Sequence, residues 1–352
     1  MSVADTRIVA ASSASARIIA AGIVIAFCYW ASEVLVTLLV AVLLAYFLDP
    51  VVTWFENLHV PRALGSLLIV LMTIALLMIV GWTLMERVDQ FGADWPKYRQ
   101  PLRAAANAVE KKLENFEARV SEIEPTQRAG EHLVAVAESH PVRSALFSRL
   151  SSLWNVVLAG TFVPFLVFFM LAAKRQVWHA TMQLFPDTER TSVKQALADV
   201  TQVLRSYVVG TALVGLVLVI ASWLFFWLIG LEFPFLVGLV SGLLNLIPYF
   251  GVVLSCLPPM LIALKQFHTV GPFIGIFAML AFIHFIAANL LVPALVGWRV
   301  RLNALAITLS LLFWGWLWGG MGLILAIPIT AVIKVVCDHV EGWQPVGHWL
   351  SG

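Results

Sequence analysis

Residues Gly242–Gly251 read GLLNLIPYFG and lie inside a long run without a charged residue. Asn245, Pro248 and the two glycines are out of place in a plain membrane-spanning helix, because proline removes a backbone donor and ends the regular hydrogen bonding. Broken, polar backbone is tolerated at the depth of a bilayer only where protein or a water-filled cavity covers it. The stretch therefore predicts an interrupted helix beside a substrate path.

The composition places the chain in a membrane. Hydrophobic residues make up 61% of the 352 residues and charged residues 12%, with a mean hydropathy of +0.92, whereas soluble proteins contain about 25% charged residues. The 22 lysines and arginines nearly balance the 20 aspartates and glutamates, which argues against a nucleic-acid partner. The three cysteines lie in or beside apolar runs, so we expect neither disulfides nor metal ligation.

Charge-free intervals locate the spans, since a spanning helix needs about 20 apolar residues. Glu33 separates the first two intervals, which we interpret as a tight helical hairpin; the alternative is one continuous tilted helix from Arg17 to Asp49. Phe27–Ser32 lacks a small-residue cleavage site, so we expect no cleaved signal peptide. The intervals cover residues 18–32, 34–48, 63–85, 150–173, 206–231, 233–264, 266–298 and 302–333.

Two intervals are too long for one span, because a helix rises about 1.5 Å per residue and the hydrocarbon core is about 30 Å thick. We interpret each as a re-entrant hairpin followed by a true span. The hairpins are predicted at about 233–249 and 303–322, and the spans after them at 250–265 and 323–338. The predicted fold is an all-α polytopic membrane protein with eight transmembrane helices and two re-entrant hairpins.

The distribution of lysine and arginine predicts the orientation. With the N-terminus inside, most basic residues of short loops lie on the inner side, and both termini are cytoplasmic. Both hairpins then enter from outside, with Glu232 at the outer face and Lys265 and Lys334 at the inner face.

Charge content and the spans divide the chain into parts. Span–hairpin–span occurs twice, over 206–265 and 271–338, with Pro259 and Pro328 each six residues before a lysine, which indicates an internal repeat or chance similarity of apolar helices. The predicted parts are three spans in 1–85, a small polar helical lobe outside the membrane in 86–149, a fourth span and an interfacial amphipathic helix in 150–205, a transport unit in 206–340 and a tail in 341–352.

The candidate site centres on the first hairpin. Pro248 frees carbonyl groups near Asn245, whose amide both donates and accepts hydrogen bonds, so together they can hold a hydroxylated ligand or a cation; a simple capped kink is the alternative. Tyr249 is a gate or an interfacial anchor. The predicted substrate-binding residues are Asn245, Pro248, Tyr249, Gly251, Asn289 and Asn303.

Three ionisable residues are candidates for coupling or gating, because charge inside a membrane is costly. Glu232 lies at the entrance of the first hairpin, and Arg299 can attract an anionic ligand or a lipid head group. His284 is a candidate proton carrier, because an unperturbed histidine titrates near neutral pH; a histidine bonded to a neighbouring helix is the alternative. Small residues let helices approach closely. The residues assigned to hairpin packing are Gly242, Gly315, Gly319, Gly320, Gly322 and Pro328.

The chain resembles the autoinducer-2 exporter family of bacterial membrane proteins, also described as PerM-like permeases. The resemblance covers about residues 15–340 and is carried by Leu244–Gly251 (LNLIPYFG), by Val292–Val300 (VPALVGWRV) and by Leu309–Lys334. It implies eight spans, cytoplasmic termini, a homo-oligomer, expected to be a pentamer, and residence in the bacterial inner membrane. Many relatives carry proline where this chain has Val252 and Ala304, which leaves hairpin geometry and substrate choice open.

The resemblance implies transport of a small polar organic molecule, or in some relatives of sodium or lithium ions against protons. We expect export of a molecule related to autoinducer-2, the quorum-sensing signal, by an elevator-like movement of residues 206–338 against a scaffold of residues 18–85 and the outer lobe. Sodium or lithium exchange for protons, with Glu232 as the coupling carboxylate, is the alternative. A non-transporting membrane scaffold is a third. The chain contains no HExxH, GxSxG or Walker motif and no Cys/His cluster, so we expect no enzyme, no cofactor and no ATP-driven pump.

Overall fold

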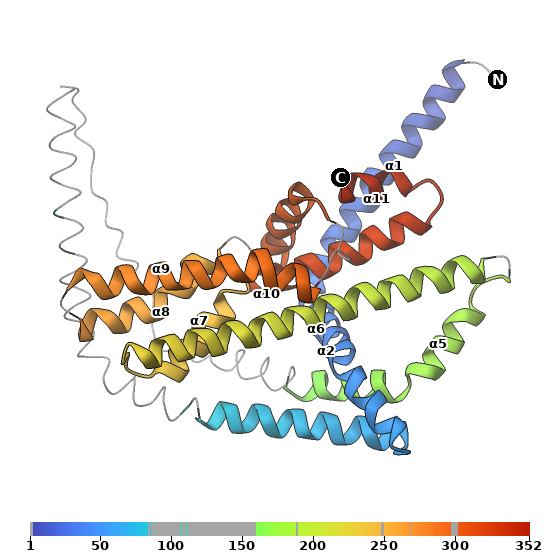
Figure 1. Cartoon of the computed structure of the whole chain (residues 1–352). Helices are drawn as coiled ribbons and strands as arrows, with labels where there is room; N and C mark the ends of the chain where they lie inside the picture. Colours follow the sequence, from blue (N-terminus) through green and yellow to red (C-terminus); the bar gives the residue numbers. More distant parts are fainter. Residues whose placement is uncertain are drawn as a thin grey trace, which may run out of the picture. The chain divides into compact units, whose positions relative to one another are not determined.

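The computed structural model describes residues 3–83, 85, 107, 111, 160–187, 189–247, 250–267, 269–296 and 302–352. Every regular element in these residues is a helix (Figure 1), so the all-α class is confirmed. Nearly all of the predicted 86–149 lobe lies outside the described residues. The chain forms two compact units: unit one comprises Met1–Ile74, Leu158–Thr211 and Pro293–Gly352, and unit two comprises Ala75–Val157 and Ala212–Val292. The boundary after Val292 falls inside the predicted transport unit, 206–340.

Five helices of the described part are long and apolar enough to cross a membrane. A sixth candidate is the pair Gly160–Ala172 and α5 (Lys174–Gln183), which is bent by 70°. Eight spans stay a prediction. The five helices are α2 (Ser32–Asn57), Arg62–Thr83, α6 (Arg190–Leu228), α9 with its π-helical continuation η1 (Val270–Val296) and α10 (Ala304–His339).

The beginning of the chain differs from the predicted hairpin. α1 (Val3–Trp30) continues into α2 across the single residue Ala31. The Ala31 amide donates to the Phe27 carbonyl and the Leu35 amide donates to the Ala31 carbonyl, so helical hydrogen bonding runs through the junction. The continuous helix, which was the alternative to a hairpin, is the arrangement observed. Glu33 does not interrupt it, because glutamate is a good helix former.

Unit two contains a helical hairpin built from α7 (Pro234–Leu244) and α8 (Gly251–Gln266). Its two ends meet: Lys265 Nζ lies 2.7 and 2.9 Å from the Glu232 carboxylate oxygens. The Gln266 side chain accepts from the Glu232 amide and donates to the Gly230 carbonyl. The expectation that Glu232 and Lys265 lie at opposite membrane faces is therefore wrong. The segment 250–265, predicted as a separate span, is the second arm of the hairpin.

Close helix contact fixes this hairpin against α6. A Cβ atom on Gly242 would come within 2.6 Å of Val219 Cα, and one on Gly238 within 2.5 Å of Trp223 Cα. Glycine permits such backbone approach between helices. α9 packs on α8, and the apolar core of the unit includes Phe226, Ile262, Ile276 and Leu280.

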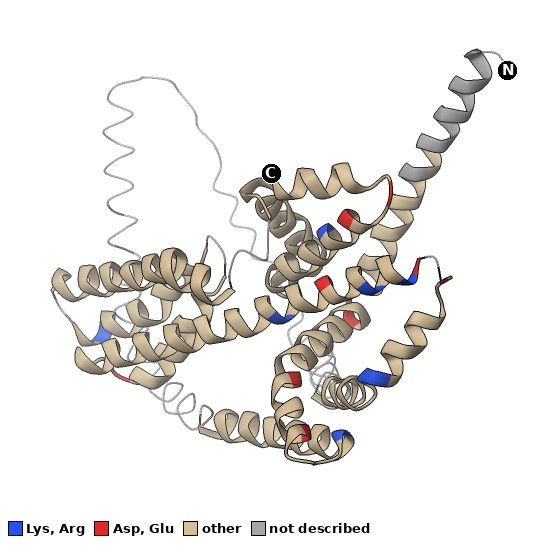
Figure 2. Ribbon diagram, turned by 45° about the vertical axis from the view of Figure 1, so that its right-hand side comes forward, with Lys and Arg blue, Asp and Glu red and all other residues tan. Residues whose placement is uncertain are grey.

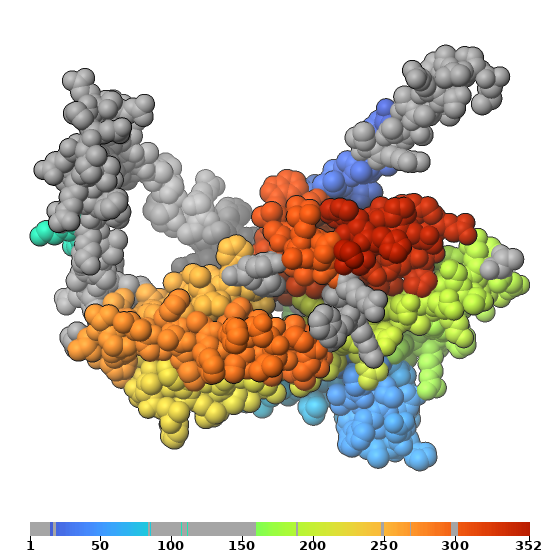
Figure 3. All heavy atoms as spheres, turned by 45° about the horizontal axis from the view of Figure 1, so that its top comes forward, coloured from blue at the N-terminus to red at the C-terminus, as the bar shows by residue number. Residues whose placement is uncertain are grey.

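The outer side of α9 is apolar. Ile274, Phe277 and Phe285 are more than half exposed, and in the space-filling view the orange atoms of this region form a continuous surface (Figure 3). Exposed apolar surface of this extent is typical of a membrane-facing helix.

α10, in unit one, is a second helical hairpin. Gly319 has φ 60° and ψ −138°, which is not helical and which glycine alone adopts easily. On either side of it, Thr330 Oγ1 donates to Ser310 Oγ at 2.8 Å, so the two arms lie side by side. Leu302, just before the first arm, packs against Ala331 and Val335 of the second. The predicted span 323–338 is thus the second arm of this hairpin, and whether either hairpin re-enters the membrane stays a prediction.

A charged cluster in unit one joins α2, the helix Arg62–Thr83 and the bent pair. Asp49 accepts from Arg62 and from Lys174, both at 2.7 Å, and Glu56 accepts from Arg62 at 3.0 Å and from Arg175 at 2.7 Å. Arg62 Nε also donates to the Leu171 carbonyl at 2.8 Å. Figure 2 shows how few charged residues the helices carry otherwise. The cluster holds helices together that are far apart in the sequence.

Replacing Gly242 with alanine is expected to lower the thermal unfolding temperature of the detergent-solubilised protein, because the added methyl group meets the Val219 backbone; overpacking costs about 1–3 kcal/mol. Gly275→Ala on α9, where a Cβ meets nothing within 4 Å, is the matched control and should be neutral or slightly stabilising. Equal unfolding temperatures for Gly242→Ala and the wild type would contradict the close α6–α7 contact.

Asp49→Asn should destabilise unit one by about 3 kcal/mol, because it leaves two cations around a buried position without their carboxylate. The control is Asp187→Asn, which removes a carboxylate that is 85% exposed and pairs with Arg190; an exposed pair contributes little. Denaturant titration of the two variants checks this, and a similar loss for both would show that burial of Asp49 is unimportant.

Candidate functional site

The turn between α7 and α8 ends α7 at Asn245, as the interrupted-helix pattern predicted. The backbone amide of Asn245 donates to the Ser241 carbonyl. The backbone amides of Leu246 and Ile247 donate to carbonyl groups three residues earlier, which tightens the helix before the chain turns. Pro248 and Tyr249 lie outside the described residues. Gly251 begins α8 directly against Asn245: a Cβ on Gly251 would lie 2.5 Å from the Asn245 carbonyl oxygen. Only glycine fits this position without moving the turn.

Two predicted site residues meet at this turn. Asn245 Oδ1 lies 2.6 Å from His284 Nδ1, which joins the end of α7 to α9 across 39 residues of sequence. Asn245 is only 4% exposed. The prediction assigned one residue to substrate binding and the other to coupling, and the structure makes them hydrogen-bond partners.

Apolar residues adjacent to the pair in the sequence pack into a core cluster. Leu246 packs with Val214 and Leu218 of α6 and with Ile283 and Ala287 of the α9–η1 helix. Its side chain also lies over Gly215, where a Cβ would come within 2.8 Å of Leu246 Cδ1. In such surroundings a hydrogen bond is strong and an unpaired polar atom is costly.

Three polar atoms of unit two are buried without a hydrogen-bond partner among the described residues: Asn245 Nδ2, Ser241 Oγ and Ser222 Oγ. Ser241 lies between Gly238 and Gly242 in the sequence of α7, and Ser222 lies beside Trp223 on α6, so both serines belong to the region of close helix contact. An unsatisfied buried polar group costs about 1–3 kcal/mol. A polar ligand at the α7–α8 turn would recover the part of that cost that belongs to Asn245 Nδ2.

The direction of the Asn245–His284 hydrogen bond determines which donors and acceptors the two side chains present to a ligand. With Asn245 Oδ1 as acceptor, His284 Nδ1 carries the proton and Nε2 is an acceptor. The N–H groups of the Asn245 side chain then have no partner within the described part of the chain. Donors and one acceptor close together suit a hydroxylated or carbonyl-bearing molecule, whereas a cation needs oxygen ligands; in the observed geometry the amide oxygen is already used.

The remaining predicted ligands and coupling residues lie elsewhere. Glu232 is at the open end of the α7–α8 hairpin, paired with Lys265. Asn289 is exposed and donates to the Phe285 carbonyl of its own helix. Asn303 caps α10 by accepting from the Ala306 amide and donates to the Trp349 carbonyl of α11 (Gln344–Ser351), so both ends of its amide have backbone partners. Arg299 lies outside the described residues.

The residues assigned to hairpin packing occupy varied positions. Gly242 is at the α6–α7 contact. In the α10 hairpin, Gly315 lies against the Leu323 side chain and Gly322 lies against the Trp314 carbonyl. Gly319 makes the turn. A Cβ added to Gly320 would meet no atom within 4 Å. Pro328 is fully buried.

Several residues were not anticipated. Ser222 and Ser241 are polar positions inside apolar runs, a signal present in the sequence but weak for so common a residue. The Asp49–Arg62–Lys174 cluster depends on contacts across 125 residues of sequence, which no local pattern indicates. Within the described part of the chain, no group of three or more His, Cys, Asp or Glu side chains is arranged to hold a metal ion.

Comparison with known proteins shows the family of the chain. The sequence profile of the AI-2E family transporters matches residues 18–342. The chain is 30% identical over 322 residues to YhhT of Escherichia coli (strain K12), which is named as a transport protein, covering 91% of this chain and 88% of that one. It is also 30% identical over 344 residues to PerM of the same organism, named as a permease, covering 93% and 91% of the two chains.

The name of a third relative includes a transported substrate. The AI-2 transport protein TqsA of Escherichia coli (strain K12) is 25% identical over 325 residues, which cover 92% of this chain and 90% of that protein. The match extends over the broken helices as well as the spans. The chain therefore belongs to the AI-2E transporter family, a family of multi-pass membrane proteins.

Proposed function

We propose that this protein is a secondary transporter that exports a small, hydroxylated organic molecule of the autoinducer-2 kind across the bacterial inner membrane. The observation that carries the proposal is the Asn245–His284 pair at the α7–α8 turn, in apolar surroundings and with an amide donor that no described residue pairs. The name of the relative TqsA supports the substrate class.

The chemistry of the pair supports an organic substrate over a bare cation. A hydroxyl or carbonyl oxygen of the substrate can accept from the side-chain amide of Asn245, and a substrate hydroxyl group can donate to His284 Nε2. A site that pairs with substrate hydroxyls discriminates strongly against analogues that lack them. In this proposal, selectivity comes from polar groups at the turn that have no hydrogen-bond partner among the described residues and can bind the substrate.

For movement, we propose that unit two, with the α7–α8 hairpin and α9, shifts as a body and carries the site between the two sides of the membrane. The compact internal packing of residues 212–292 supports this. In this proposal both hairpins re-enter the membrane, the termini are cytoplasmic, and the protein works as a homo-oligomer, a pentamer by family resemblance, in the lipid bilayer.

Asn245→Ala should reduce autoinducer-2 export from cells by about tenfold, the effect of losing one good hydrogen bond in a buried site. Asn289→Ala is the matched control: the same residue type is changed on the α9–η1 helix, where the side chain bonds to its own helix. Export is measured at equal membrane levels of protein. Full export by Asn245→Ala, or an equal loss in Asn289→Ala, would contradict the proposed site.

The competing function is sodium or lithium exchange for protons through Glu232. Its carboxylate is held by the Lys265 ammonium group, which would have to be displaced before a cation could bind. The double variant Glu232→Gln, Lys265→Gln removes both members of the ion pair and so leaves neither charge unpaired. We therefore expect it to keep exporting the organic substrate.

The competing function is measured in liposomes that enclose a pH-sensitive dye and receive sodium or lithium under a proton gradient. Wild-type protein should give no cation-dependent pH change. A cation-dependent signal that disappears in the double variant would overturn the organic-export proposal in favour of antiport.

A further inference from the structure

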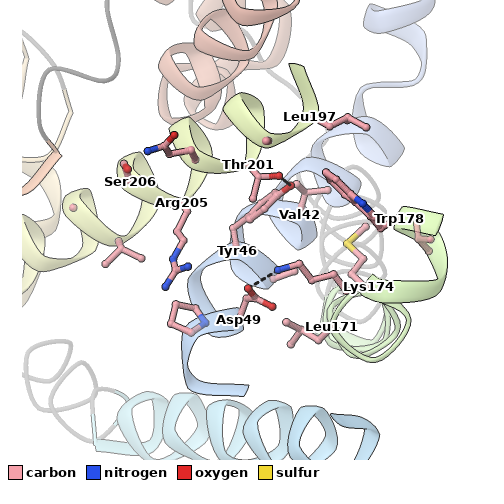
Figure 4. A pocket seen from close by; sticks show the side chains of 18 of the residues that line it. Val42, Tyr46, Asp49, Leu171, Lys174, Trp178, Leu197, Thr201, Arg205 and Ser206 are labelled. Carbon is pink, nitrogen blue, oxygen red and sulfur yellow. Dashed lines mark hydrogen bonds and ion pairs between the residues drawn. The ribbon is translucent and has the colours of Figure 1, made fainter. Parts of the chain in front are cut away.

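Unit one contains a cavity of ≈ 990 Å³ that the transport site does not use. Its walls come from α2, the bend before α5, α5 itself and the first half of α6 (Figure 4). The hydroxyl oxygens of Tyr46 and Thr201 lie 3.3 Å apart on one wall. Most of the remaining wall is apolar, including Val42, Met170 and Leu295.

Cations are in excess at this cavity. Lys174 lines it and shares Asp49 with Arg62, and the cluster of Asp49, Glu56, Arg62, Lys174 and Arg175 holds three cations against two carboxylates. Arg205 of α6 adds a further positive charge. Its side chain extends into the cavity toward the region of Asp49 and Lys174 (Figure 4), and no residue of the described part pairs with its guanidinium group.

The combination of apolar walls and excess positive charge selects an amphiphile. A small polar solute would leave the apolar walls without a partner, and a plain hydrocarbon would leave Arg205 without an anion. Basic pockets between membrane helices on the cytoplasmic side bind anionic lipid head groups. With the N-terminus inside, the orientation predicted from the lysine and arginine distribution puts Arg62, Lys174 and Arg205 at the cytoplasmic side of the membrane.

We propose that this cavity binds an anionic phospholipid of the inner leaflet. Its phosphate group lies between Arg205 and Lys174, and an acyl chain follows the apolar wall formed by α2, α6 and Leu295. Arginine suits the phosphate because its planar guanidinium donates two parallel hydrogen bonds. Tyr46 and Trp178 line the same cavity, as expected for aromatic residues at the level of lipid head groups. This proposal stands independently of the transported substrate.

The test uses the purified full-length protein in detergent, with phosphatidylglycerol, phosphatidylcholine or inorganic phosphate added. Native mass spectrometry counts bound lipid, and thermal unfolding measures stabilisation. The wild type should retain phosphatidylglycerol in preference to phosphatidylcholine. Arg205→Gln should reduce this preference about fivefold, the effect of one basic side chain near an anionic head group.

Two further variants separate charge from shape. Lys194→Gln removes an exposed cation from the same helix at a position outside the cavity wall and should keep the wild-type preference. Ala198→Trp fills the cavity at an exposed position of α6 and should lower phosphatidylglycerol binding without changing charge.

Three results would overturn the proposal. The first is an unchanged lipid preference in Arg205→Gln. The second is full competition by inorganic phosphate, which would identify a plain anion site. The third is dissociation of an oligomer by Ala198→Trp with lipid preference intact, which would identify the cavity as a contact between copies of this chain.

Discussion

Hydrocarbon offers no hydrogen bonds, so a helix interrupted inside a membrane must find partners for its freed backbone groups within the protein. In the proposed topology, in which both hairpins re-enter the membrane, they meet this requirement in similar ways. Each has a close contact that fixes its arms, at Gly242 against α6 and at Ser310 with Thr330, and each has a glycine at its turn, Gly251 or Gly319. At the α7–α8 turn, Asn245 and Gly251 are buried, and the buried polar side-chain atoms without a partner in the described part of the chain are Ser222 Oγ, Ser241 Oγ and Asn245 Nδ2.

In the proposed function, those few polar groups connect the fold with transport. A protein that satisfied every buried donor at the α7–α8 turn would have no affinity for a hydroxylated solute there. Leaving Asn245 Nδ2 without a partner among the described residues costs stability, and the apolar packing around Leu246 keeps the turn ordered despite that cost. The ion pair of Glu232 with Lys265 closes the opposite end of the same hairpin. The hairpin is thus stabilised at its ends and sides and is polar at its turn.

Local signals predicted the broken helices well. Pro248, Asn245 and the flanking glycines all act within a few residues of one another, so the end of α7 at Asn245 and the start of α8 at Gly251 could be anticipated. Partners distant in sequence could not. Asn245 and His284 meet because α9 packs on the hairpin, and Asp49 meets Lys174 because several helix segments converge. Counting charges also put Lys265 and Glu232 at opposite faces, because the orientation rule treats each lysine as an independent anchor and ignores its pairing with a carboxylate.

The most direct test of the account is hydrogen–deuterium exchange of the protein in lipid nanodiscs, with and without autoinducer-2. The account predicts that the substrate slows exchange at the α7–α8 turn, in peptides covering residues 241–254, and in the part of α9 around His284. Slowing confined to other segments, with exchange at the turn unchanged by saturating substrate, would contradict the central claim that Asn245 and His284 form the substrate site.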